Sequence, residues 1–147
     1  MSGAPVPWSL KLAYWTALLV DVAFVRVARA ASLTLKDAPL FGIRRFQTVL
    51  LPERALTPEL RLIAQGKATS NLAFTVLAVT LGLQHSPASP TGRLVARIFL
   101  IVHVVSTALS VRYGLIEPTQ FQQPMAAVLT HASWALLASH GLWTAQA

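Results

Sequence analysis

The chain has 147 residues, of which 54% are hydrophobic and only 12% are charged, so it lacks the polar surface that a water-soluble domain of this size needs. It contains no cysteine, which excludes disulfides, cysteine metal sites and a cysteine nucleophile. The formal net charge is +7, but the basic residues flank apolar segments, which favours contact with membrane lipids and argues against a nucleic-acid partner.

Four apolar segments follow one another along the chain. A helix needs about 20 apolar residues to cross the hydrocarbon core of a bilayer. We expect spans at about Trp8–Arg29, Thr57–Leu83, Arg93–Leu115 and Phe121–Trp143. A spanning segment must satisfy its own backbone hydrogen bonds, so each is predicted to be a helix. The predicted fold class is all-α, an integral membrane four-helix bundle, with residues 1–147 forming one transmembrane domain.

Capping and turn residues separate the predicted spans. Thr57 and Pro58 form an N-cap and a first helical position before the second span. The serines and prolines of residues 86–90 break the chain between the second and third spans, and Pro118 ends the third. Aromatic residues near the span ends suit the head-group layer. These residues are Trp8, Tyr14, Trp15 and Trp143.

The basic residues predict an orientation in the membrane. Eight of them flank the first and third connections: Arg26, Arg29, Lys36, Arg44, Arg45, Arg54, Arg61 and Arg112. Three lie on the other side: Lys11, Arg93 and Arg97. By the positive-inside rule, the first and third connections face the cytoplasm and both termini face the lumen or exterior. The first connection, about residues 30–56, is long and mixes apolar with basic residues, which predicts a segment in the membrane interface.

Polar residues inside the spans are the main functional clues, because they are unfavourable at membrane depth. Asp21 lies in the first span, and Lys67, Ser70 and Asn71 share one face of the second. The third has a stripe at i, i+3, i+4 and i+7: His103, Ser106, Thr107 and Ser110. The fourth carries Thr130, His131 and Ser133. We expect these polar faces to turn inward, toward each other or toward a subunit interface.

Each of these residues also has a purely structural interpretation. Serine and threonine in membrane helices often bond to their own backbone or pack helices together. Asp21 and Lys67 are candidates for a structural ion pair, and His131 for a hydrogen bond between helices. No metal site is predicted, because His103, His131 and His140 lack a carboxylate at a recognisable spacing.

Two segments resemble motifs of a known family of membrane proteins. Residues 63–70 (I-A-Q-G-K-A-T-S) resemble its second-helix pattern R-A-H-x-N-x-x-E, in which Ala64 matches while Lys67 and Ser70 replace the asparagine and the glutamate. Residues 103–110 fit the frame of its third-helix pattern R-x-x-H-T-x-x-Y and retain Thr107.

Two connecting segments extend the resemblance. Lys36 and Asp37 resemble an acidic turn before the family's second helix, and Gln120 follows Pro118 where the family has a basic residue. Over nearly its whole length the chain thus resembles the MAPEG family, membrane-associated proteins in eicosanoid and glutathione metabolism. The resemblance implies a homotrimer in the endoplasmic reticulum. It also implies glutathione as cofactor, with Arg61, Arg112 and Tyr113 supplying anion-binding groups from neighbouring turns.

The first hypothesis for function is therefore a MAPEG-like membrane enzyme, a glutathione-dependent transferase or isomerase acting on a lipophilic small molecule. His103 would carry a proton, because imidazole titrates near neutral pH, with Lys67 beside it. The substrate or cofactor would be bound by Asp37, Ser70, Asn71, Ser106, Ser110, Arg112, Tyr113, Gln120 and His131.

Two further hypotheses remain open. The replaced motif residues favour a non-catalytic subunit or scaffold that uses the long basic loop as a docking surface. Alternatively, the chain is a cofactor-free cyclase or isomerase of a terpenoid-like substrate. That chemistry needs an acid in an apolar cavity, and Asp21 would supply it.

Overall fold

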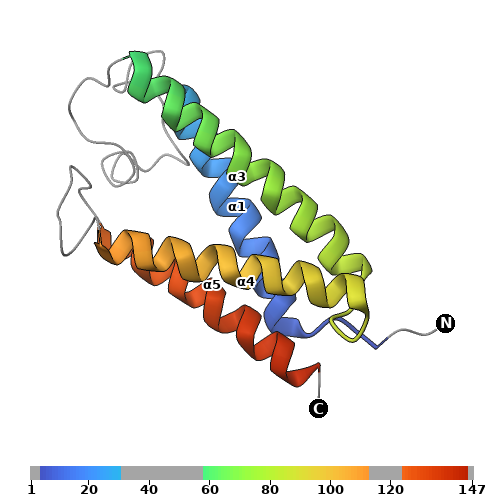
Figure 1. The fold of residues 1–147 in the computed structure, drawn as a ribbon. Coiled ribbons are helices and arrows are strands. Elements are labelled where there is room, and N and C mark those ends of the chain that lie inside the picture. Colours follow the sequence, from blue (N-terminus) through green and yellow to red (C-terminus); the bar gives the residue numbers. More distant parts are fainter. Residues whose placement is uncertain (1–3, 31–57, 113–123, 146–147) are drawn as a thin grey trace.

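The computed structural model describes residues 4–30, 58–112 and 124–145. This part of the chain contains four long helices (Figure 1): α1 (Trp8–Ala30), α3 (Pro58–Gln84), α4 (Pro90–Val111) and α5 (Pro124–Thr144). The predicted all-α class and the four long helices are confirmed. The predictions for Asp37, Tyr113, Gln120 and the first connection fall outside the described residues.

The helix ends follow local capping signals. α3 begins at Pro58, as predicted, and α4 begins at Pro90 rather than at the predicted Arg93. The earlier start has a clear cause, because Ser89 is the N-cap and its hydroxyl accepts a hydrogen bond of 3.1 Å from the backbone N–H of Gly92. The predicted break at residues 86–90 is therefore a tight turn between α3 and α4.

The helices form two pairs that meet at one end only. α1 packs along α3, and α4 packs along α5, whereas the contacts between the two pairs are fewer. In Figure 1 the pairs meet near the α3–α4 turn and diverge toward the C-terminal ends of α1 and α4. We call the half around the α3–α4 turn the closed end, and the half where the pairs diverge the open end.

The core lies mostly at the closed end and is built largely from small and aromatic side chains. Its buried members are Leu10, Ala13, Tyr14, Ala17, Ala78, Val79, Ala96, Phe99, Trp134 and Ala138. Alanine and glycine let helix backbones approach closely. The prediction that Tyr14 lies in the head-group layer is wrong, since only 1% of it is exposed. Its ring lies where Gly82 leaves room, edge-on to Phe99 at 5.0 Å.

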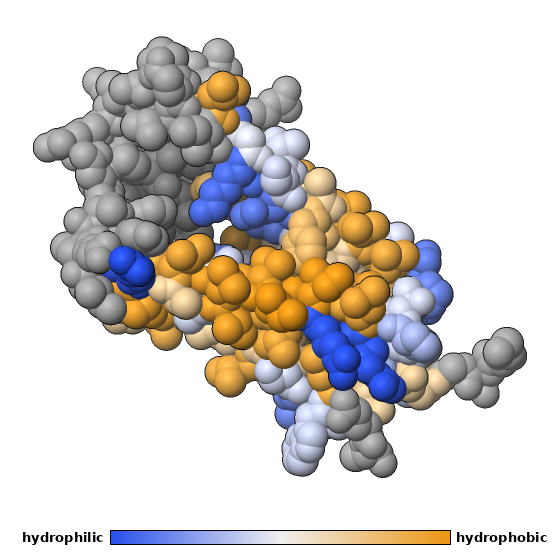
Figure 2. All heavy atoms as spheres, viewed as in Figure 1, coloured by the Kyte–Doolittle hydropathy of each residue, from blue (hydrophilic) through white to orange (hydrophobic). Residues whose placement is uncertain are grey.

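The outer surface is strongly apolar. Large hydrophobic side chains are exposed along all four helices, and Figure 2 shows them as a continuous patch over α4. Among the described helices, Trp8–Val25 of α1 and Pro90–Val111 of α4 are long and apolar enough to cross a membrane. Trp8, Trp15 and Trp143 are exposed, as a head-group location requires.

Candidate functional site

The inner faces of the helices change from apolar to polar where the closed end meets the open end. On α1 the buried ladder of Leu10, Tyr14 and Ala17 continues one turn later with Asp21. On α4 the buried ladder of Ala96 and Phe99 continues with His103. Asp21 and His103 are among the few buried polar side chains of the described residues. The candidate site begins at this boundary.

His103 of α4 and His131 of α5 form the centre of the site. Their Nδ1 atoms lie 3.1 Å apart, and the two rings are stacked with centroids 5.3 Å apart. His103 is only 5% exposed. A hydrogen bond between two ring nitrogens requires that one carries the proton and the other accepts it. The two imidazoles therefore form a hydrogen-bonded pair, which we call the histidine pair.

The other ring nitrogen of His103 has no hydrogen-bond partner among the described residues. Its Nε2 atom is buried and makes no hydrogen bond within the described part of the chain. If the Nδ1 atom of His103 donates to His131, its Nε2 atom is an acceptor without a donor. If Nδ1 accepts instead, Nε2 carries an N–H group without an acceptor. In both tautomers one polar atom is left unsatisfied, which is unfavourable for a buried group unless a ligand or water completes it.

Aromatic rings hold the histidine pair in place. The ring centroids of Phe99 and Trp134 lie 4.3 and 4.9 Å from that of His103, both in tilted, edge-type contacts. The indole N–H of Trp134 donates to the hydroxyl of Thr16 at 2.9 Å, which ties α5 to α1. The sequence interpretation missed Trp134, although it lies three residues after His131 and therefore on the same helix face.

Asp21 lies between α1 and α3. The hydroxyl of Thr75 donates to its Oδ2 atom at 2.5 Å. The predicted ion pair with Lys67 is not formed, because the carboxyl of Asp21 faces Thr75, two helical turns further along α3. Asp21 is therefore a hydrogen-bond acceptor that joins two helices, and it does not neutralise Lys67.

The open end carries further polar side chains from two helices. Lys67 is exposed and Asn71 is half-buried on α3, and Ser106 and Ser110 are half-buried on α4. Figure 2 shows the surface hollowed between α3 and α4, with hydrophilic side chains of α3 along the hollow. These four side chains make no hydrogen bond within the described residues.

Other predicted polar residues have structural roles or lie at the surface. Thr107 donates to the backbone oxygen of His103 at 2.7 Å, and Ser133 to that of Leu129 at 2.7 Å. The interpretation of such residues as backbone-bonded is thus confirmed for these two. Ser70 is exposed. Arg112 is exposed at the C-cap of α4, where its backbone N–H donates to the oxygens of two residues in the last turn.

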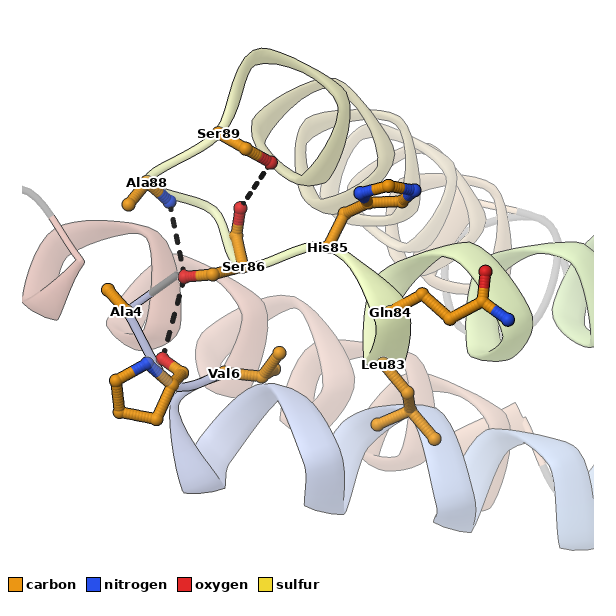
Figure 3. A pocket seen from close by; sticks show the side chains of 9 residues that line it. Ala4, Val6, Leu83, Gln84, His85, Ser86, Ala88 and Ser89 are labelled. Atoms are coloured by element: carbon orange, nitrogen blue, oxygen red, sulfur yellow. Dashed lines mark hydrogen bonds between the residues drawn. The ribbon is translucent and has the colours of Figure 1, made fainter. Parts of the chain in front are cut away.

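A pocket at the closed end is distinct from this site. Its volume is about 540 Å³, and it lies between the N-terminal segment at Ala4–Val6 and the α3–α4 turn (Figure 3). The hydroxyl of Ser86 donates to the backbone oxygen of Pro5, and that of Ser89 donates to the backbone oxygen of Ser86. These hydrogen bonds stabilise the turn. None of the predicted catalytic residues lines the pocket. Among the described residues, no three His, Asp or Glu side chains gather to hold a metal.

Comparison of the chain with protein-family models, with curated protein sequences and with solved structures finds no match.

Proposed function

We propose that this chain is an integral membrane enzyme that binds a lipophilic small molecule at the open end and moves a proton on it through the histidine pair. One observation carries the proposal: the buried Nε2 atom of His103 has no partner within the described residues, while the Nδ1 atom of the same ring contacts a histidine that can exchange a proton with it. A purely structural histidine is expected to have its hydrogen bonds satisfied.

The apolar surface of the helices supports the membrane setting. α1 and α4 are apolar enough to span a bilayer, and α3 and α5 pack along them with comparable lengths of 27 and 21 residues. A polar helix can cross the membrane when its polar residues face the bundle interior. We therefore propose that all four helices span the bilayer, with the connections at the open end in the cytoplasm.

The chemistry that suits the histidine pair is proton transfer. One imidazole holds the N–H between the rings, and the other supplies a lone pair. A proton taken from the substrate at Nε2 of His103 could be balanced by a proton returned to another substrate atom, which is an isomerisation. If glutathione is the co-substrate, its thiol proton would go to Nε2, the thiolate would add to one carbon of an electron-poor C=C bond of the lipophilic partner, and the proton would return from Nε2 to the other carbon.

An exchange experiment tests this proposal and does not require the substrate to be identified first. The purified protein is placed in nanodiscs with lipids extracted from its native membrane, in D2O, with and without glutathione. Mass spectrometry then reads deuterium gained by any lipid-soluble compound and any glutathione adduct formed. We expect deuterium incorporation or adduct formation that depends on the protein.

Matched variants assign the activity to the site. His103→Ala and His131→Ala are expected to abolish the product, whereas His140→Ala is expected to retain it, because His140 is exposed and contacts Ser9 at the closed end. Asp21→Asn separates this mechanism from one in which Asp21 is the acid. Full product formation by the His103→Ala protein would refute the proposal.

A further inference from the structure

Lys67 is a cation with no acidic partner among the described residues, in a helix that we place in the membrane. It lies about 14 Å along the axis of α3 from Pro58, at ~1.5 Å per residue. The acidic residue within the neighbouring helix, Asp21, is bonded to Thr75 instead. Ionised side chains at membrane depth normally pair with another group, and an unpaired one indicates a functional site.

The face that carries Lys67 is turned toward α4. Lys67, Asn71 and Phe74 are spaced at i, i+4 and i+7, which places them on one side of α3. Phe74 stacks on Phe99 of α4, with ring centroids 6.4 Å apart and an interplanar angle of 17°. Because Lys67 is on the same side of α3 as Phe74, it lies beside the space between the two helix pairs.

Neutral hydrogen-bonding groups lie on the facing helix. Ser106 and Ser110 follow His103 at i+3 and i+7 on α4, and both are half-buried without a hydrogen bond among the described residues. Asn71 of α3 is also half-buried and makes no hydrogen bond among the described residues. A single positive charge with several neutral donors is the arrangement that binds a carboxylate or phosphate group.

The surroundings of these polar groups are apolar. On α4, Val102 and Leu109 are exposed and lie within ~60° of Ser106 around the helix axis, and Figure 2 shows hydrophobic surface of α4 beside the hollow. A small soluble anion would use the charge but none of the apolar surface. A molecule with an anionic head and an apolar tail would use both.

We infer that the open end binds the head group of an anionic amphiphile, with Lys67 as the charge partner of its carboxylate or phosphate and with Asn71 and Ser106 as hydrogen-bond donors. This inference rests on the proposed function, because it names the class of the lipophilic substrate. It is tested by binding alone, so it can fail while the deuterium exchange that depends on the histidine pair is still observed.

The experiment is a titration of the full-length protein in phosphatidylcholine nanodiscs, followed by native mass spectrometry. Four probes are compared: oleate, 1-oleoyl lysophosphatidate, oleyl alcohol and inorganic phosphate. Lys67→Gln is the test variant, and Lys11→Gln is its control, because Lys11 is also an exposed lysine but lies in the first turn of α1 at the closed end.

We expect oleate, lysophosphatidate or both to bind, with affinity for the Lys67→Gln protein reduced about tenfold or more, as the loss of a charge-assisted hydrogen bond requires. The Lys11→Gln protein should bind as the unmodified chain does. Binding of only one of the two acids supports the inference and identifies the anionic group. Equal affinity in the Lys67→Gln protein, equal binding of oleyl alcohol, or equally tight binding of phosphate alone would each overturn it.

Discussion

The two ends of this bundle are built from the same four helices but pack differently. At the closed end, glycines at positions 82, 92 and 141 face a neighbouring side chain or backbone so closely that no methyl group could be added. At the open end, Gly66 has nothing within 4 Å of the position of an added Cβ. The buried residues at the closed end are mostly apolar, and the buried polar Ser9 has a partner there in His140. Polar side chains without partners among the described residues gather at the open end. Close packing holds the helices together at one end, and at the other end the described helices diverge.

The largest change in stability is expected for a substitution at Gly92. A Cβ atom there would overlap the backbone oxygens of His85 and Ser86 in the α3–α4 turn. Backbone atoms cannot rotate away, so Gly92→Ala should lower the free energy of unfolding by about 3 kcal/mol, at the upper end of overpacking effects. The measurement is a reversible unfolding titration with sodium dodecyl sulfate in mixed micelles. An unchanged midpoint would show that the closed end is not tightly packed.

A smaller loss is expected at Thr75, where the closed end meets the open end. Thr75→Val keeps the shape of the side chain but removes the hydroxyl that donates to Asp21. Loss of a hydrogen bond to a carboxylate is expected to lower the free energy of unfolding by about 2 kcal/mol. Thr80→Val is the control, because Thr80 is exposed on the same helix and should change stability little. Equal effects of the two variants would contradict the assigned contact.

A substitution in the histidine pair should have a large effect on the proposed activity and a modest effect on the free energy of unfolding. His131→Ala leaves the Nδ1 atom of His103 without its partner, in addition to the unpartnered Nε2. A further unsatisfied buried polar atom is expected to lower the free energy of unfolding by about 1 kcal/mol. The same titration measures it, with His85→Ala as the control, because the half-buried side chain of His85 makes no hydrogen bond among the described residues. A stabilised His131→Ala protein would mean that the pair is strained rather than bonded.

The smallest effect, and the only one of opposite sign, is expected at Gly66. Gly66→Ala adds a methyl group where there is open space, and alanine favours a helix over glycine by about 0.5–1 kcal/mol. We expect a slight gain in the free energy of unfolding, in contrast to Gly92→Ala. A loss as large as that at Gly92 would show that the open end is closed in the membrane.

The sequence is sufficient to predict the helices but not how they pair. Apolar length and the serine–proline break at residues 86–90 predict where α3 ends and α4 begins to within one turn. The polar stripe starting at His103 is also visible from its spacing. Its contact with His131 is not, because residues on different helices meet only through packing, and periodicity within one helix gives no information about its neighbour.

Two predictions from the sequence are wrong for the same physical reason. The position of Tyr14 near a span end predicts the head-group layer, yet Gly82 makes room for its ring in the core. Asp21 and Lys67 are opposite charges inside the predicted spans, which suggests an ion pair, yet Thr75 lies opposite Asp21. In each case the partner is a small or neutral residue, which carries little signal in the sequence. The MAPEG resemblance stays a prediction that rests on the layout of the four predicted spans and the long first connection, and on the motif residues.

The most direct test of the histidine pair is nitrogen NMR of the chain labelled with ¹⁵N-histidine in nanodiscs. The chain has only four histidines, so their ring nitrogens can be assigned with single substitutions. We predict a scalar coupling across the hydrogen bond between the Nδ1 atoms of His103 and His131. We also predict that lipid extract from the native membrane shifts the Nε2 signal of His103 but not those of His85 and His140. Absence of the coupling, together with an Nε2 signal that no ligand moves, would contradict both the pair and its proposed role.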